Sequence, residues 1–246
     1  MRPTPLRFWL FIVAGLCALN LQAAEPDELY KASGMAQHQQ HFQSALKAAQ
    51  QRYFQQLPTA LQETLLRNSN QRFAPQDMHD RAQARLALAL SEADSRQALT
   101  FFNSKLGRKV VAAEIWASSP AAVARMQQGI PAQSLGPVRR ALIDRLLTQL
   151  PALEMGVEVS SALTGLAAQS ANDLLGGLIT LPAQAGTGGQ AQLRERMRTD
   201  LPQTLAYIYR DLSDDELAHF AQWSESSSGQ AFYRATEQAV RDALNP

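Results

Sequence analysis

One pattern occurs twice in this chain of 246 residues, at residues 90–107 and again, without a gap, at residues 212–229. The identical pairs, 122 positions apart, are Leu90 and Leu212, Ser91 and Ser213, Ser104 and Ser226, and Gly107 and Gly229. The similar pairs are Glu92 and Asp214, Asp94 and Glu216, and Phe101 and Trp223. Neither copy contains residues typical of a catalytic site, so we interpret the repeat as one structural unit used twice.

Each copy begins with the spacing of a helix N-cap. The two serine–acid pairs are Ser91 with Asp94 and Ser213 with Glu216. A serine oxygen at this position accepts a hydrogen bond from a free amide of the first turn, and a glutamate three residues later completes a capping box. Apolar residues then recur at i, i+3 and i+4, as on one face of a helix. A later serine in each copy predicts a second N-cap, which ends one helix and opens the next.

A glycine follows each later serine after three residues, at Gly107 and Gly229. Glycine costs about 1 kcal/mol of helix propensity relative to alanine. We therefore expect another backbone to approach both glycines closely. The alternative is that each glycine ends the preceding helix. We also expect the matching aromatic residues, Phe101 and Trp223, to be buried.

The pattern of leucine, serine, acid, aromatic residue, serine and glycine resembles a domain-of-unknown-function family, number 2059. That family comprises exported, all-helical proteins of Gram-negative bacteria, with a signature of roughly F-Y-x-S-P-x-G-[QK]. Residues 101–108 and 223–230 match it, although both copies lack the proline after the serine. The resemblance implies an exported, all-helical protein, and it brings no catalytic residues to this chain.

The first 23 residues have the pattern of an export signal. A basic start with Arg2 and Arg7 precedes an apolar run over residues 8–19 and the small residues Ala23 and Ala24. We predict cleavage after Ala23 or Ala24, and hence a periplasmic or secreted protein. The alternative, a retained membrane anchor, would require a longer apolar run.

Cleavage would remove the only cysteine, Cys17, together with two basic residues. Leu16 precedes Cys17 where lipoprotein signals have a small residue, so we do not expect lipid attachment. A mature chain without a thiol excludes disulfides, thiolate nucleophiles and cysteine–zinc sites. The full chain has 23 basic and 22 acidic residues, so the mature chain has 21 basic and 22 acidic residues and a net charge of −1. Since nucleic-acid binding usually requires a basic protein, we expect none.

The chain after the signal predicts an all-α fold, a helical bundle made of two pseudo-repeats at residues 24–128 and 137–246. Glycine and proline residues at 129–131 and 136–137 mark the strongest internal boundary, so we place a linker at residues 129–136. No segment alternates between apolar and polar residues over a strand's length, so strands are not expected. Each half alone would be small, and we expect the two to share a core.

Apolar periodicity places the other helices at residues 26–33, 35–56, 59–66, 75–90, 110–126, 138–150, 152–181, 190–209 and 229–244. We expect loops at residues 68–70 and at the glycine-rich residues 186–189. The apolar segment 152–181 contains Asp173 and many small polar residues. We therefore predict a buried helix there, and no transmembrane segment in the mature chain.

Two histidines lie three residues apart on a predicted helix, at His38 and His41, which would place two imidazoles on one face. No carboxylate or third histidine lies nearby at ligand spacing, so we predict solvated histidines, and neither a metal nor a cofactor. Ser44 and Lys47 match the Ser-x-x-Lys of penicillin-recognising enzymes. The companion Lys-Thr-Gly is absent, and that chemistry uses a mixed α/β fold. We therefore predict no such enzyme.

The basic residues Arg194, Arg196 and Arg198 alternate along a predicted helix. Alternation spreads side chains around a helix, so a solvated face is the simplest interpretation. The helix adjoins the predicted glycine-rich loop, and loops commonly frame functional surfaces. We therefore take these three arginines as the candidate binding surface.

No segment matches a serine-hydrolase, zinc-protease or phosphate-loop motif. The sequence favours a non-enzymatic module of the cell envelope that binds another macromolecule, with an envelope protein as the expected partner. Two alternatives stay open: a carrier of an apolar small molecule, suggested by the alanine- and glycine-rich segment 155–179, and a hydrolase whose carboxylates the fold brings together. A dry cavity would favour the carrier. Carboxylates about 5–9 Å apart in a cleft would favour the hydrolase, and an exposed apolar patch would favour the binding module.

Overall fold

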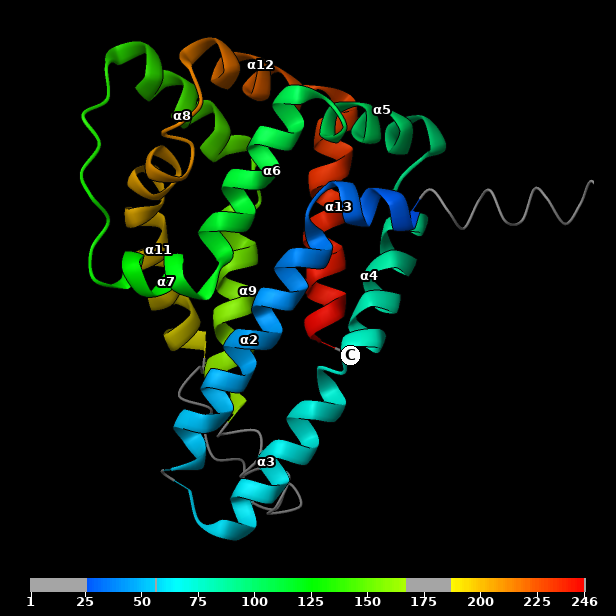
Figure 1. Ribbon diagram of the computed structural model, residues 1–246, viewed down its shortest axis with the longest axis vertical. Helices are drawn as coiled ribbons and strands as arrows, with labels where there is room; N and C mark the ends of the chain where they lie inside the picture. The colour runs from blue at the N-terminus through cyan, green and yellow to red at the C-terminus, as the bar shows by residue number, and fades with distance from the viewer. Residues whose placement is uncertain (1–25, 56, 167–186, 246) are drawn as a thin grey trace, which may run out of the picture.

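The computed structural model describes residues 26–55, 57–166 and 187–245, and every regular element within these ranges is a helix (Figure 1). A short helix at residues 26–32 comes first. The others are α2 (Met35–Phe54), α3 (Thr59–Arg72), α4 (Pro75–Ala89), α5 (Glu92–Phe102), α6 (Lys105–Ser118), α7 (Pro120–Gln127), α8 (Pro137–Gln149), α9 (Ala152–Thr164), α11 (Thr187–Ile208), α12 (Asp214–Glu225) and α13 (Ser227–Leu244). The prediction of an all-helical protein is confirmed. The predicted export signal at residues 1–23 lies outside the described residues.

Helix α13 runs through the middle of the molecule beside α4, while α5 and α12 lie across its upper end (Figure 1). Apolar residues recur every three or four positions along α13, and Phe232, Ala235 and Ala239 are buried. This spacing directs them to one face of the helix. They belong to a hydrophobic core that also contains Leu86 of α4 and Ile143 of α8, so both halves of the chain contribute to it.

Arginines from α3 and α4 hold the C-terminal end of α13. The Arg81 guanidinium donates to the carbonyl oxygens of Asp242 and Ala243, at 3.1 and 2.8 Å. Arg72 donates to the carbonyl oxygen of Leu244 at 3.0 Å. The last carbonyls of a helix have no partner within it and carry the negative end of its dipole. The first half of the chain therefore supplies the cap for its last helix.

The first N-cap of each repeated pattern is present as predicted. The hydroxyl oxygens of Ser91 and Ser213 accept from the amides of Asp94 and Glu216, both at 3.1 Å. The Glu216 carboxylate also accepts from the Ser213 amide at 2.8 Å and completes a capping box. The second copy thus has the fuller cap, because its acid is the longer glutamate.

Gly107 and Gly229 lie at the tight turn between the two helices of each copy. A Cβ atom on Gly107 would lie 2.0 Å from the carbonyl oxygen of Phe101, and one on Gly229 would lie 2.1 Å from that of Trp223. The amide of each glycine donates to the hydroxyl of the serine three residues earlier, at 2.9 and 3.1 Å. The expected close approach of another backbone is confirmed, and it explains why both positions require glycine.

Phe101 and Trp223 stack on each other, with ring centroids 3.8 Å apart and planes inclined by 5°. Both side chains are half-buried. The prediction that both are buried is therefore wrong. Because each ring covers a face of the other, neither has to enter the core completely.

Two polar contacts join the same helix pairs in a reciprocal manner. The Asp94 carboxylate, at the start of α5, accepts from the hydroxyl of Ser228 on α13 at 2.7 Å. The Glu216 carboxylate, at the start of α12, accepts from Lys109 on α6 at 2.5 Å. The N-terminal acid of each copy thus contacts the second helix of the other copy.

The prediction of a loop at residues 68–70 is wrong, because α3 continues through them to Arg72. Serine and asparagine favour loops when their side chains pair with nearby backbone. Here the side-chain amide of Gln50, on α2, donates to Ser69 Oγ and Asn70 Oδ1, both at 2.8 Å. A contact with another helix thus offsets the local preference.

The helix predicted at residues 110–126 is divided into α6 and α7. Helix α6 ends at Ser118, and Ser119 caps the next helix by accepting from the amide of Ala122 at 3.3 Å. Pro120, the first residue of α7, has no amide hydrogen with which to continue α6. A serine cap followed by proline therefore starts a new helix.

Helix α9 covers the first part of the apolar segment 152–181, and residues 167–181 lie outside the described residues. Of the predicted loop at residues 186–189, Gly186 also lies outside. Residues 187–189 form the first turn of α11, so the prediction is wrong there. Gln190 donates to Ser161 of α9 at 3.5 Å, and this contact helps to hold the start of α11. Within the described ranges, no helix has the length and hydropathy to cross a membrane.

Candidate functional site

An open groove of about 790 Å³ lies between α2 and α3, which form the lower part of the molecule in Figure 1. Its lining residues are Gln43, Leu46, Lys47, Gln50, Gln51, Phe54, Gln55, Leu66 and Asn70. The volume falls within the range of about 300–1,000 Å³ that is common for ligand sites. The groove is therefore the first place to look for a binding function.

The lining follows the periodicity of the helix. One row, with members four residues apart, consists of Gln43, Lys47 and Gln51 on α2 and of Gln55, the residue that follows the helix. Because an α-helix rises 1.5 Å per residue, neighbouring members lie about 6 Å apart along its axis. A second row consists of Leu46, Gln50 and Phe54, and α3 contributes Leu66 and Asn70 from the opposite side. The groove is thus a regular ladder of polar groups beside an apolar strip.

Two of the glutamines are fixed by contacts with α3 and the residues after it. Gln50 is only 7% exposed, and its amide nitrogen donates to Ser69 and Asn70. The Gln43 amide nitrogen donates to the carbonyl oxygen of Phe73 at 2.8 Å. An amide donates through its nitrogen and accepts through its oxygen. Among the described residues, no donor pairs with the oxygen of either amide.

The charge in the groove is a single cation. Among the described residues of the lining, Lys47 is the only charged one, and none of them is an aspartate or glutamate. Phe54, at one end, is 39% exposed and offers an aromatic surface. General acid–base catalysis by paired carboxylates needs acids that this lining does not supply. The described lining therefore offers a ligand amide groups, one cation and an aromatic ring.

His38 and His41 converge on one hydroxyl group. The Nδ1 atoms of both lie 2.8 Å from Ser118 Oγ, at the end of α6, and both residues are partly buried. The prediction of solvated histidines is therefore wrong, because Ser118, far away in the sequence, provides a partner. Burial, and then the charge of His41, lowers the pKa of His38 to about 4.

This cluster has the partners of a structural contact. The Ser118 hydroxyl can also donate to the carbonyl oxygen of Ile115, at 3.1 Å. A hydroxyl carries one proton, so at least one imidazole must be the donor to Ser118. Among the described residues, no group of three or more histidine, cysteine or acidic side chains is placed to hold a metal ion. The cluster therefore joins α2 to α6.

Among the described residues, no hydrogen bond joins Ser44 to Lys47. The Ser44 hydroxyl donates to the carbonyl oxygen of Gln40 at 3.1 Å, within its own helix. Lys47 lines the groove. The Ser-x-x-Lys match therefore reflects two residues three apart on one helix, whose side chains do not pair.

A second polar contact involves Glu114 of α6, which is half-buried. The hydroxyl of Tyr209 donates to Glu114 Oε1 at 2.6 Å. Burial raises the pKa of Glu114 to about 7, against the opposite effect of this hydrogen bond. Burial, and then the Glu114 charge, raises the pKa of Tyr233 as well. In the sequence, the signal for this site is a single acid, Glu114, within the otherwise apolar run 110–117. That signal alone does not predict its partner, Tyr209.

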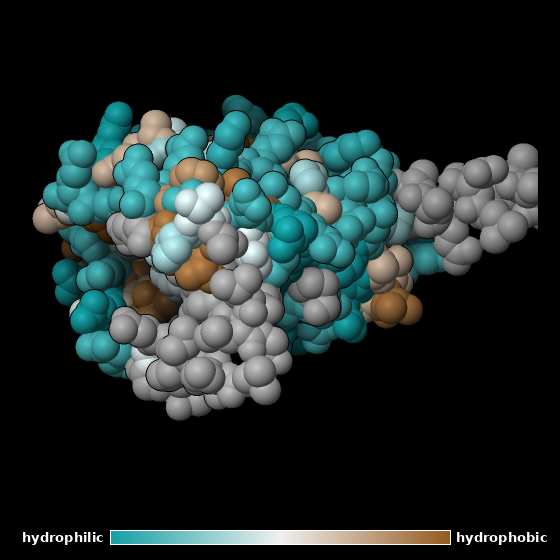
Figure 2. All heavy atoms as spheres, turned by 90° about the horizontal axis from the view of Figure 1, so that it is seen from below, coloured by the Kyte–Doolittle hydropathy of each residue, from teal (hydrophilic) through white to brown (hydrophobic). Residues whose placement is uncertain are grey.

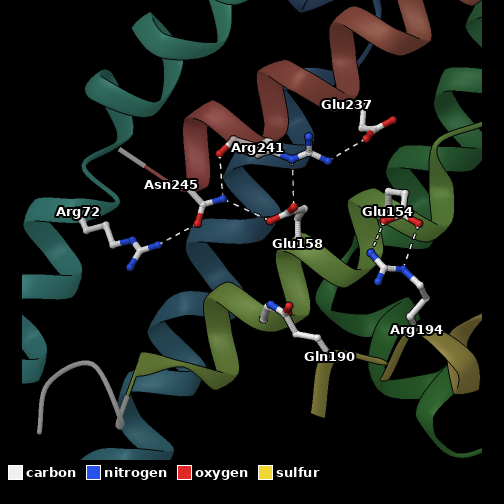
Figure 3. A network of polar contacts seen from close by, with 9 residues as sticks. Arg72, Glu154, Glu158, Gln190, Arg194, Glu237, Arg241 and Asn245 are labelled. Carbon is white, nitrogen blue, oxygen red and sulfur yellow. Dashed lines mark hydrogen bonds and ion pairs between the residues drawn. The ribbon is translucent and has the colours of Figure 1, made fainter. Parts of the chain in front are cut away.

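The three candidate arginines do not form one cationic surface. Arg194 donates two hydrogen bonds to the Glu154 carboxylate on α9, at 2.6 and 3.2 Å (Figure 3). Arg198 pairs with Glu195 of its own helix at 3.3 Å, and Arg196 is exposed. The Arg194 hydrogen bond is the main cause that lowers the pKa of Glu154. Alternation along the helix has therefore separated the three side chains.

Beside this pair, a polar network reaches the end of α13. Arg241 donates to Glu158 of α9 at 3.2 Å and to Glu237 at 2.9 Å, and Asn245 donates to Glu158 at 3.3 Å (Figure 3). Arg72 donates to Asn245 Oδ1 at 3.1 Å. The network ties α3, α9 and α13 together, and its charges are paired within the protein.

The described residues define an all-helical protein with an open groove lined by both polar and apolar side chains. Residues 76–134, from α4 to the segment after α7, match the model of a family described as "Uncharacterized protein conserved in bacteria (DUF2059)". This match includes the first copy of the repeated pattern and confirms the resemblance inferred from it. No curated protein and no solved structure matches the chain.

Proposed function

We propose that this chain is an exported, non-catalytic binding protein of the bacterial cell envelope, and that the groove between α2 and α3 is its binding site. The observation that carries the proposal is the groove itself. Its lining combines amide groups, an exposed aromatic ring and one lysine, without an acid. Export follows from the signal pattern of residues 1–23, and the match to a bacterial family is consistent with an envelope location.

We further propose that the chain consists of two pseudo-repeats, residues 24–128 and 137–246, around one core. The shared pattern of caps and glycines, and the reciprocal contacts between the copies, support this architecture. Residues 129–136, where we place the linker, contain no helix. In this arrangement α2 and α3 belong to the first pseudo-repeat, where they precede its copy of the repeated pattern, and they carry the site.

An exposed apolar patch is not the basis of this proposal. The large apolar side chains that are exposed in the described residues, Phe54, Leu88, Val123 and Val138, lie on four different helices. Seen from below, the surface is mostly hydrophilic, and hydrophobic residues come to view in small groups (Figure 2). We therefore place the binding site in the groove and not on an apolar patch.

The two alternatives have less support. A carrier of an apolar molecule needs an enclosed, dry cavity, whereas this groove is open to solvent. Much of the segment 155–179, which suggested the carrier, lies outside the described residues. A hydrolase needs two acids, which the groove lining does not contain. The arginine surface at Arg194, Arg196 and Arg198 is a weaker binding candidate than the groove, because Arg194 pairs with Glu154 and Arg198 pairs with Glu195.

In-cell photo-crosslinking tests this proposal. A photoreactive benzoylphenylalanine replaces Gln51 in the groove, or Gln37, which is exposed on the same helix outside it. We expect an adduct with an envelope protein in the Gln51 variant and little or none in the Gln37 variant. No adduct at Gln51, or equal adducts at both positions, would contradict the groove as the site.

A further inference from the structure

We propose that the groove accepts an extended segment of a partner protein, with apolar side chains at alternate positions and a carboxylate that faces Lys47. This inference rests on the proposed function and adds the chemistry of the ligand.

The spacing of the polar row favours an extended polypeptide. Neighbouring members of the row Gln43, Lys47, Gln51 and Gln55 lie about 6 Å apart along α2. An extended chain repeats the orientation of its backbone groups every two residues, roughly 6.7 Å. A segment that lies along α2 therefore presents an N–H or C=O group near each member of the row, and the long glutamine side chains adjust to the difference.

The chemistry of the glutamines matches that of a backbone. A peptide group has one N–H donor and one C=O acceptor. A primary amide has the same two kinds of group, with a second N–H donor in addition. Gln50 and Gln43 use their nitrogens within the protein, so their oxygens are left to accept from backbone N–H groups of the segment. Gln51 and Gln55 are exposed and supply both kinds of group.

The apolar strip favours a polypeptide over a glycan. Leu46, Leu66 and Phe54 line the groove beside the amides. A glycan would also pair with amides, but its hydroxyl groups would gain little from the two leucines. In an extended peptide, alternate side chains point to one face. Apolar residues at every second position would therefore cover the strip while the backbone lies on the glutamines.

Lys47 sets the charge of the ligand. It lies within the polar row, one turn from Gln43 and one from Gln51, and the part of the lining that the structure describes contains no acid to neutralise it. A partner that placed a cation there would be repelled, and one that placed a carboxylate there would be attracted. An acidic residue in the segment is thus the expected partner of Lys47.

Selection from a random decapeptide library on the full chain tests this inference. Three proteins serve as bait: the wild type, Lys47→Glu, and the control Arg52→Glu, which changes an exposed charge of α2 outside the groove lining. We expect wild type and Arg52→Glu to select apolar residues at alternate positions together with aspartate or glutamate. Lys47→Glu should select lysine or arginine at the same place. With a selected peptide, replacement of its acid by lysine should weaken binding to the wild type about fivefold.

The outcomes separate this inference from the proposed function. Selected peptides without a two-residue period, or with the same charge on all three baits, would overturn the extended acidic segment. So would tight binding of an N-acetylglucosamine oligomer that displaces the selected peptides, since the groove would then be a glycan site. In either case an adduct at position 51 would still support the groove. Absence of that adduct would overturn the function itself.

Discussion

The ring of Phe101 lies parallel to that of Trp223, with centroids 3.8 Å apart and an angle of 5° between the planes. These two residues occupy equivalent positions in the repeated pattern. The pattern therefore contacts itself: the end of α5 meets the end of α12, and the acid at the start of each helix contacts the other copy. The stack is one of several contacts through which the two proposed repeats join.

The stack should contribute measurable coupling between the two helix pairs. Replacement of either ring by alanine should lower the free energy of unfolding by about 2 kcal/mol, less than for a fully buried ring because both are half-buried. The double variant Phe101→Ala, Trp223→Ala should then cost about 1 kcal/mol less than the sum of the single changes. Urea unfolding of the four proteins measures this. Fully additive losses would show that the rings do not interact energetically.

The two turn glycines should not tolerate alanine. A Cβ atom would lie 2.0 Å from the Phe101 oxygen in Gly107→Ala, and 2.1 Å from the Trp223 oxygen in Gly229→Ala. We expect each variant to lose at least about 2 kcal/mol of stability, although alanine is the better helix former by about 1 kcal/mol. Gly136→Ala, where no atom lies within 4 Å of an added Cβ, is the control and should change stability little. Unchanged thermal unfolding of Gly107→Ala would contradict the tight turn.

Glu114 should make the protein less stable as the pH rises. Its pKa is about 7 in the folded protein and about 4.5 in the unfolded chain, so unfolding releases a proton between these values. The free energy of unfolding should fall by at most about 3 kcal/mol from pH 4.5 to pH 7 through this group. Glu114→Gln keeps an acceptor for Tyr209 and should remove that loss. If both proteins show the same dependence in urea unfolding, the carboxyl is not protonated in the core.

His38 should act in the opposite direction. Its pKa is about 4 in the folded protein and about 6.5 in the unfolded chain, so the unfolded chain gains a proton first as the pH falls. Stability should therefore be lost from pH 6.5 towards pH 4, and His38→Gln should remove this loss. Between pH 4.5 and 6.5 the two groups compensate. The Glu114→Gln variant keeps only the effect of His38, so its stability should rise with pH in this interval. The His38→Gln variant keeps only the effect of Glu114, so its stability should fall. If the stability of both variants changed with pH in the same direction, the assignment of these two opposite effects would be wrong.

The features that could be predicted from the sequence are those with local causes. The caps at Ser91 and Ser213 need only the residues of one helical turn, and the glycine at position 107 needs only the turn before it. The loop at Ser69 was predicted wrongly because its partner, Gln50, lies on another helix. The environment of His38 depends likewise on Ser118, which no local pattern reveals.

The groove could not be predicted for the same reason. The spacing of Gln43, Lys47 and Gln51 is visible in the sequence, and it reads as an ordinary solvated face of a helix. It becomes one wall of a groove only because α3 brings Leu66 and Asn70 to its side. The candidate site thus depends on the angle between two helices, which sequence periodicity does not specify.

Blocking the groove is the most direct test of the account. In a chain with Cys17 replaced by alanine, Gln51→Cys, in the groove, or Gln37→Cys, outside it, is labelled with a bulky maleimide. Titration calorimetry then measures the affinity of each labelled protein for a decapeptide selected on the wild type. The account predicts at least about a tenfold loss for the label at position 51, which is about 1.4 kcal/mol, and a change of less than about twofold at position 37. Equal affinities of the two labelled proteins would contradict the claim that this groove is the binding site.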